Sequence, residues 1–168
     1  MKIVSLLITL TVFIFALQLG EKVPTAILDG KNGGYINGTA WSSKTLKGKV
    51  HLLLYADPDK KEAMSTLIDM LKSNRFANKL TTVAIINMKA TWLPDFVIEK
   101  KLKSKQKELQ HIRYVVDKSK YLVKRWHLKD NDTNILLFDK KGRLRYLHRG
   151  EIDQKELNKI IKLIQKNL

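Results

Sequence analysis

Residues 50–56 (VHLLLYA) form an apolar run that is interrupted only by His51. A strand with one face in water alternates apolar and polar residues, and this run does not. Such a run is typical of a strand that is buried on both faces. It predicts a central sheet with other elements packed on each side.

The segments that follow alternate between helix and strand patterns. Apolar residues recur at helical spacing at Met64, Leu67, Ile68 and Leu71, which predicts an amphipathic helix. Further strands are expected at residues 82–87, 112–117 and 134–139, and further helices at residues 94–110 and 121–126. Residues 134–139 and 143–149 are expected to form a hairpin. The chain ends with a sequence that resembles a capping box and a helical stripe of Leu157, Ile160, Ile161, Ile164 and Leu168.

This order predicts an α/β fold with a central mixed β-sheet flanked by helices, ending in a C-terminal β-hairpin and helix. Residues 23–39 are rich in Gly and Asn. They are expected to form a loop or loose hairpin before the domain proper.

Residues 1–20 have the composition of an export signal, with Lys2 followed by an apolar or neutral run to Leu19. The run is also at the lower limit of length for a membrane span, so an uncleaved anchor stays open. We therefore expect a signal peptide or N-terminal anchor at residues 1–20 and one domain at residues 21–168. The expected location is periplasmic or otherwise exported, and membrane-anchored if the leader is retained.

The formal net charge is +16, which indicates anionic partners such as nucleic acid, phospholipid head groups or acidic glycans. Of the 32 basic residues, 26 are lysine and six are arginine. This balance favours a solvated surface over specific phosphate recognition. In the densest run, residues 99–107, a helix would place Ile98, Leu102 and Leu109 on one side with lysines around them. A solvated helix face and an anion-binding surface both stay open there.

Two stretches resemble exported thioredoxin-like proteins. Residues 46–50 (LKGKV), followed by the apolar strand and the amphipathic helix, are similar to the opening of that group. Residues 134–144 (NILLFDKKGRL) look like its strand, turn and strand with a D-x-x-G-R hairpin. With the phrase W-S-S-K-x-L-x-G-K-V at residues 41–50, residues 21–168 most resemble the YtfJ-type periplasmic proteins, a thioredoxin-like family of unknown function.

The resemblance implies a thioredoxin-like fold, with the usual cysteine pair near Lys60 and Ala63 and the usual cis-proline near Thr133. The chain has no cysteine, and a thiolate is the attacking species in thiol–disulfide exchange. Without proline, a trans peptide bond is expected at Thr133. Disulfide exchange, thiol peroxidase and thiol-transfer activities are therefore excluded, and no redox partner is expected.

The emptied position keeps a helix N-terminus beside a loop, where free N–H groups can hold an anion. Asp57 and Asp59 can instead cap the helix themselves. A self-capped structural turn and an anion or peptide site both stay open. The candidate ligand-binding residues of this degenerate loop are Asp57, Pro58, Asp59, Lys60, Lys61, Ala63 and Thr133.

No other chemistry is indicated by the sequence. The four histidines (His51, His111, His127 and His148) have no second ligand at metal-binding spacing, so no metal and no other cofactor is expected. There is no nucleophile elbow, phosphate-binding loop or dinucleotide fingerprint. Trp41, Trp92 and Trp126 are expected to be core or rim aromatics.

We therefore expect an exported, non-catalytic thioredoxin-like binding protein, not an enzyme, whose partner is a protein or cell-envelope component. The alternative is a basic binder of an anionic polymer, either nucleic acid or acidic envelope glycan, including a regulator role. An export signal is difficult to reconcile with a chromosomal target, and no helix-turn-helix phrase stands out.

Overall fold

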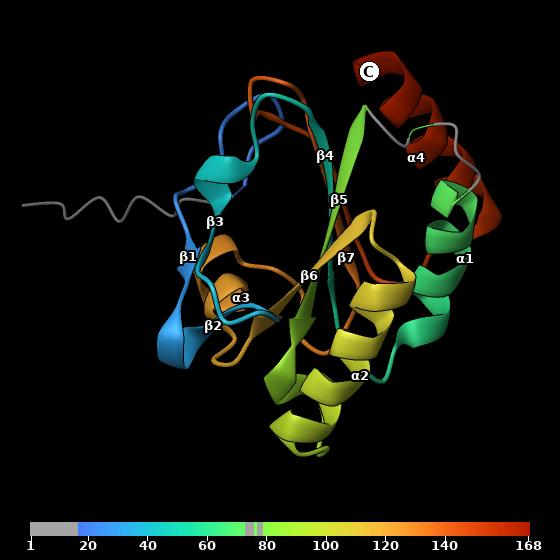
Figure 1. Cartoon of the computed structure of the whole chain (residues 1–168). Coiled ribbons are helices and arrows are strands. Elements are labelled where there is room, and N and C mark those ends of the chain that lie inside the picture. Colours follow the sequence, from blue (N-terminus) through green and yellow to red (C-terminus); the bar gives the residue numbers. More distant parts are fainter. Residues whose placement is uncertain (1–16, 73–75, 77–78) are drawn as a thin grey trace, which may run out of the picture.

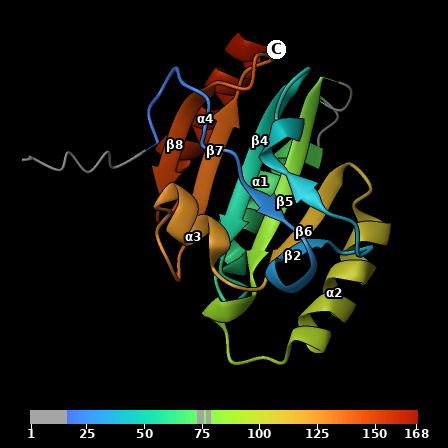
Figure 2. The ribbon, with the colours of Figure 1, turned by 90° about the vertical axis from the view of Figure 1, so that its left-hand side faces the viewer.

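The computed structural model describes residues 17–72, 76 and 79–168. Among these residues a six-stranded mixed sheet forms the centre of the fold. Its spatial order is β2 (Gly33–Tyr35), β6 (Ile112–Asp117), β5 (Leu80–Asn87), β4 (Val50–Ala56), β7 (Asn134–Phe138) and β8 (Leu144–Arg149). β4, β5 and β6 are parallel, whereas β2, β7 and β8 each run antiparallel to their neighbours. Figure 2 shows these strands side by side.

Helices cover both faces of the sheet (Figure 1). One face carries α1 (Lys61–Lys72), α2 (Asp95–Glu108) and α4 (Gln154–Asn167). The other carries α3 (Tyr121–Trp126) and a small sheet of β1 (Ile27–Leu28) and β3 (Trp41–Ser42). Short 3-10 turns lie at η1 (Gly30–Asn32), η2 (Ser43–Thr45) and η3 (Met88–Ala90).

The strand β4 divides the core into two layers. Leu52 and Leu54 pack with α1, α2 and α4, while Leu53 and Tyr55 pack with α3 and the N-terminal segment. All seven residues of β4 are buried. The prediction of a strand with two covered faces is confirmed, and with it the mixed α/β architecture.

The expected C-terminal hairpin and helix are also present. β7 and β8 pair antiparallel, and α4 follows with Leu157, Ile160 and Ile164 buried. The Asp153 side chain accepts a hydrogen bond from the Glu156 N–H at 2.7 Å. The capping residue therefore starts the helix where the sequence placed it.

The expectation of a loop or loose hairpin outside the domain proper at residues 23–39 is wrong in one part. Residues 33–35 form β2, which pairs with β6 at the edge of the main sheet. Gly33 permits this pairing, because its φ is +123° and a Cβ built on it would lie 1.9 Å from the Val116 carbonyl oxygen. The glycines that indicated a loop instead allow a close approach of two backbones.

Two tryptophans match the expected core role and one does not. Trp41 and Trp126 are fully buried and meet edge to face, with ring centroids 6.2 Å apart. Trp92 is 86% exposed. The prediction that it belongs to the core or rim is therefore wrong.

Most of the expected leader, residues 1–16, lies outside the described residues. A signal peptide or anchor at residues 1–20 therefore stays a prediction. Among the helices of the described residues, none combines the length and the hydropathy that crossing a bilayer requires.

Candidate functional site

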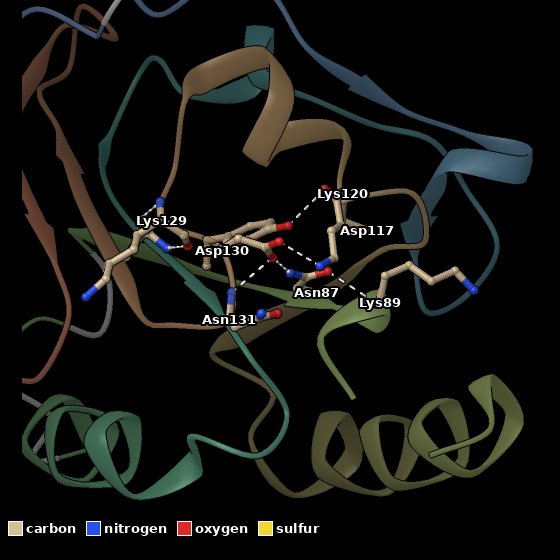
Figure 3. A network of polar contacts seen from close by, with 9 residues as sticks. Asn87, Lys89, Asp117, Lys120, Lys129, Asp130 and Asn131 are labelled. Carbon is tan, nitrogen blue, oxygen red and sulfur yellow. Dashed lines mark hydrogen bonds and ion pairs between the residues drawn. The ribbon is translucent and has the colours of Figure 1, made fainter. Parts of the chain in front are cut away.

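The parallel strands bring polar residues from three parts of the chain to one edge of the sheet. Asp57 follows β4, Asn87 ends β5 and Asp117 ends β6. The loop before β7 reaches the same edge, since Asn134 at the start of β7 pairs with Tyr55 near the end of β4. Crevices at the carboxyl ends of parallel strands are the usual ligand positions of open α/β sheets. Figure 3 shows the polar contacts that result.

Asp117 is a fully buried carboxylate whose contacts are all structural. It accepts hydrogen bonds from the Tyr55 hydroxyl at 3.2 Å and from the N–H groups of Tyr121 and Leu122 at 2.8 and 2.9 Å. These bonds fix the start of α3 on the sheet. Because its acceptor sites are used by the protein itself, Asp117 is a positioning residue.

Asp130 connects the ends of β5 and β6 to the loop before β7 (Figure 3). It accepts hydrogen bonds from Asn87 Nδ2 at 3.0 Å and from Lys120 Nζ at 2.6 Å. Burial alone would raise the pKa of Asp130, but the hydrogen bonds from Lys120 and the Asn131 N–H outweigh it and lower this pKa. Asp130 is therefore an ionised, partnered carboxylate at neutral pH.

Backbone strain is concentrated in the segment between β6 and β7 that carries Asp130. Among the described residues, the only non-glycine residues with positive φ are Lys120, His127 and Asn131, at +55°, +51° and +54°. All three lie between β6 and β7. Left-handed backbone costs about 1–3 kcal/mol per residue and is concentrated at functional sites. The strain marks this loop as fixed by its contacts with the sheet edge.

Asp57 lies at the turn between β4 and α1 and is only 6% exposed. Its Oδ1 accepts a hydrogen bond from the Asp59 N–H at 2.8 Å, and its carbonyl accepts one from the Lys60 N–H at 3.1 Å. Burial raises the pKa of the Asp57 carboxyl, and the nearby negative charges of Asp59 and Asp130 raise it further. The folded environment therefore favours the neutral form of the Asp57 carboxyl more than water does.

An apolar cavity of about 360 Å³ opens beside Asp57 and Pro58, between α1 and α2. Figure 3 shows these two helices on the same side of the sheet, below the polar network. The walls are mainly apolar and come from both helices, from β5 and β6 and from the loop before α2: Ile68, Ile86, Leu93, Ile98, Leu102 and Tyr114. Lys101 and Lys105, one turn apart on α2, also line it. Its size and composition are those of a small ligand pocket.

The sequence-predicted site residues are brought together in part. Asp57 and Pro58 line the cavity, and Asp59 and Lys60 are exposed in the adjoining turn. Thr133 lies in the loop before β7. Its neighbour Asp132 has a lowered pKa, because burial raises it less than the hydrogen bonds from Lys129 and the Thr133 N–H lower it. The charge of Lys60 also lowers this pKa, so the loop lies close enough to the β4–α1 turn for their charges to interact. The described residues have only trans peptide bonds, Thr133 included.

Lys61 and Ala63 lie in the first turn of α1, and only their backbone is described. The Asp57 side chain bonds the Asp59 N–H within the turn. The self-capping expected of Asp57 therefore takes the form of a capped turn that precedes the helix. The ligand-binding role of all seven residues stays a prediction.

Sequence reasoning missed the cavity walls and the polar network. Lys101 and Lys105 have a four-residue spacing that places them on one helix face, a signal that the sequence already carried. Asn87 and Asp117 each end a predicted strand, and the convergence of parallel strand ends could have placed them together. The contribution of Tyr114 and Ile86 depends on which strands are neighbours, and the sequence did not state that order.

Comparison with solved structures identifies the fold. A thiol peroxidase from Chromobacterium violaceum superposes with a TM-score of 0.64 at 15% identity, over 90% of this chain and 87% of its own. The exposed lipoprotein thioredoxin Etrx1 of Streptococcus pneumoniae superposes with a TM-score of 0.59 at 16% identity, over 85% of this chain and 99% of its own. The chain is therefore a thioredoxin-like α/β protein, as expected from its sequence.

Comparison with protein families makes the assignment narrower. Residues 25–167 match a family described as "Bacterial protein of unknown function (YtfJ_HI0045)", and the chain belongs to this family. An uncharacterized protein of Haemophilus influenzae is 25% identical over 160 residues, covering 88% of this chain and 85% of the relative. The uncharacterized protein YtfJ of Escherichia coli K12 is 25% identical over 164 residues, covering 90% of this chain and 87% of the relative.

The arrangement limits the chemistry of the site. A thioredoxin-like fold normally uses cysteine at the β4–α1 turn, and this chain has no cysteine at all. Thiol chemistry is therefore absent. Within the described ranges, no three His, Asp or Glu side chains lie close enough to hold a metal ion together. The site offers a mainly apolar cavity whose lining includes one buried carboxyl, that of Asp57, and two cations, Lys101 and Lys105.

Proposed function

We propose that this chain is an exported, non-catalytic binding protein that holds a segment of a cell-envelope protein in the cavity between α1 and α2. One observation carries the proposal. The cavity starts at Asp57 and Pro58, in the turn where redox-active proteins of this fold place their cysteines, and this chain has no cysteine. We therefore propose that the turn that holds the reactive cysteines in those proteins borders a binding cavity in this chain.

The apolar walls of the cavity favour an apolar side chain of the partner. Ile68, Ile98 and Leu102 are buried residues of the helices that border the cavity. Covering one large apolar side chain of a partner contributes about 1.5–3 kcal/mol. An aliphatic or aromatic side chain is therefore the anchor that we propose for this cavity, and Asp57 is a polar residue of its lining.

The cations beside the cavity add selectivity. Lys101 and Lys105 are both exposed and both line the cavity. Positive charges next to an apolar pocket favour a partner segment with acidic residues beside its apolar anchor, and they disfavour a basic one. We therefore propose an apolar side chain flanked by Asp or Glu as the recognised feature. Proteins of the cell envelope are the proposed source, because the leader sequence predicts export.

Peptides selected from a random displayed library on the purified protein provide a probe for this proposal. Their affinity is measured by calorimetry for the wild type, for Ser104→Trp, which places an indole at the cavity mouth, and for Lys100→Trp on the outward side of the same helix. We expect selected peptides to combine apolar and acidic residues. Ser104→Trp should weaken binding at least roughly tenfold, the loss of about one buried apolar contact, and Lys100→Trp should leave it unchanged.

Two results would overturn the proposal. Equal affinities of the two tryptophan variants would place peptide binding outside the cavity. Turnover of a scrambled disulfide substrate or of insulin above background by the purified protein would contradict the non-catalytic assignment.

A further inference from the structure

Helix α2 carries a second surface on the side away from the sheet. Phe96, Lys100, Lys103 and Lys107 follow each other at spacings of four, three and four residues, which places them on one face of a helix. All four side chains are exposed, whereas Ile98 and Leu102 on the opposite side are buried. Trp92 precedes this face in the loop that leads into α2. We call Trp92, Phe96, Lys100, Lys103 and Lys107 the α2 surface.

The two aromatic residues of the α2 surface are unusually exposed. Trp92 is 86% exposed and Phe96 is 72% exposed, and they are the only exposed large aromatics among the described residues. Aromatic side chains bury a large apolar area when they find a partner. Two of them in water within four residues mark an interaction surface.

The lysines of the α2 surface are not neutralised by ion pairs among the described residues. No ion pair within the described part of the chain includes Lys100, Lys103 or Lys107. The acidic residues of α2 lie off this face, and Glu99 is paired with Lys118 at 2.7 Å. The exposed residues that define this face are therefore cationic and aromatic, and they are complementary to an anionic surface with an apolar interior.

Helix α4 provides an internal comparison. Lys155, Lys159, Lys162 and Lys166 have the same spacing along α4 as Phe96 and the three lysines along α2, and all are exposed. Lys159 is paired with Glu156 at 2.9 Å, and α4 has no exposed large hydrophobic residue. A lysine stripe alone is an ordinary solvated face. The exposed aromatic pair is the feature that distinguishes α2.

We propose that the α2 surface docks on an anionic phospholipid bilayer, with Trp92 and Phe96 in the headgroup region and the lysines against the lipid phosphates. Three features favour a bilayer over a nucleic acid. The aromatics sit at one end of the surface and do not alternate with the lysines as a base-stacking platform does. The cations are lysines, which act as point charges and suit a diffuse anionic surface. Trp and Phe are also the residues that amphipathic helices place at a bilayer interface.

Tryptophan fluorescence of the full-length protein tests the proposal directly. Trp41 and Trp126 are fully buried, so a change in exposure reports on Trp92. Vesicles of phosphatidylcholine with phosphatidylglycerol should shift the emission to the blue and protect it from acrylamide, and vesicles of phosphatidylcholine alone should not. Trp92→Phe should abolish the shift. Because the apolar residues 3–19 are present in every sample, their own affinity for lipid cancels in the comparison.

Two charge-reversal variants separate the α2 surface from general basicity. Lys100→Glu with Lys103→Glu and Lys107→Glu should weaken partitioning onto anionic vesicles by about 100-fold or more, since each lysine at such a surface contributes roughly a factor of five. The same reversals at Lys155, Lys162 and Lys166 on α4 change the net charge equally and should cost less than about tenfold. Circular dichroism confirms that both variants fold.

Three outcomes would overturn the proposal: an emission of Trp92 that anionic vesicles leave unchanged, equal losses for the α2 and α4 variants, or tighter binding to a single-stranded oligonucleotide than to the vesicles. The cavity between α1 and α2 is not part of this surface. Failure of vesicle binding therefore leaves peptide binding in the cavity untouched.

Discussion

The hydroxyl of Tyr55 in β4 donates a hydrogen bond to Oδ2 of Asp117 at the end of β6, across 3.2 Å. β5 lies between these two strands, so the tyrosine side chain crosses a whole strand to reach its partner. Both residues are fully buried. Burial, with the negative charge of Asp117, raises the pKa of Tyr55 well above its ordinary value. The tyrosine therefore stays protonated and acts as a donor at any physiological pH.

This contact predicts a defined loss of stability on removal of the hydroxyl. Tyr55→Phe should lower the free energy of unfolding by about 1–3 kcal/mol, because it leaves a buried carboxylate with one hydrogen bond fewer. Urea unfolding followed by circular dichroism measures the change. Tyr121→Phe is the matched control, since Tyr121 is only partly buried, and it should change stability little. Equal effects of the two variants would contradict the role assigned to the Tyr55 hydroxyl.

The edge strand β2 gives a second prediction, at Gly33. A Cβ on this residue would meet the Val116 carbonyl oxygen at 1.9 Å, and its φ of +123° is strained for other residues. Gly33→Ala should therefore destabilise the protein by about 2 kcal/mol or more and release β2 from β6. Gly38 also has a positive φ, of +89°, but a Cβ added there would have nothing within 4 Å. Gly38→Ala should therefore lower the free energy of unfolding by only about 1 kcal/mol. Hydrogen exchange of the β2 amides distinguishes the two; protection retained in Gly33→Ala would refute the argument.

The parts of the fold that local patterns determine could be predicted from the sequence. β4 and β6 have the expected limits, and α4 begins at its capping residue Asp153. The hydrophobic pattern of its own residues specifies each strand. The start of α4 is specified by Asp153, whose side chain caps the N–H of Glu156 three residues later. The thioredoxin-like resemblance then supplied the position of the β4–α1 turn.

The candidate site could be predicted only in part, because most of it depends on contacts between distant segments. The resemblance to thioredoxin-like proteins places Asp57 and Pro58 in the turn after β4, which is where they lie. Lys120 and Asp130 meet through the backbone path between β6 and β7, and no periodicity indicates that path. The sequence predicts a core or rim position for Trp92 because the three tryptophans are not clustered along one element as a stacking platform requires. Its exposure is a departure from the average behaviour of this residue type, which no local pattern indicated.

Asp57 predicts a pH dependence of stability with a definite sign. Burial raises the pKa of this carboxyl in the folded protein, so the folded state holds the proton more tightly than the unfolded state. The stability that this group contributes is fully present below its unfolded pKa and is lost as the pH rises through its folded pKa. Asp57→Asn does not titrate. In measurements from about pH 3 to neutral pH, the stability of the wild type relative to this variant should therefore fall as the pH rises above the ordinary carboxyl pKa of about 4.

Asp130→Asn is the control with the opposite sign. Burial of Asp130 is outweighed by the hydrogen bonds from Lys120 and the Asn131 N–H, which lower its pKa. Its contribution is present above its unfolded pKa and is lost as the pH falls through the folded value. Urea unfolding of the three proteins across this pH range measures both trends. Parallel curves for wild type and Asp57→Asn would mean that the pKa of Asp57 is not raised.

Thr133 predicts a stabilising substitution next to the site. It is 1% exposed, and its Oγ1 has no hydrogen-bond partner among the described residues. A buried hydroxyl without a partner costs about 1–3 kcal/mol, and valine has nearly the same shape without the polar atom. Thr133→Val should therefore raise the free energy of unfolding by about 1 kcal/mol in urea titrations.

Thr39→Val is the matched control for this substitution, because the exposed Thr39 donates a hydrogen bond to Asn37 Oδ1 at 2.7 Å. Removing that bond should cost up to about 1 kcal/mol. The two threonine variants should thus change stability in opposite directions. A loss of stability in Thr133→Val would mean that the Thr133 hydroxyl has a partner in solution, and the loop facing Asp57 and Lys60 would then have to be assigned a polar contact that holds it.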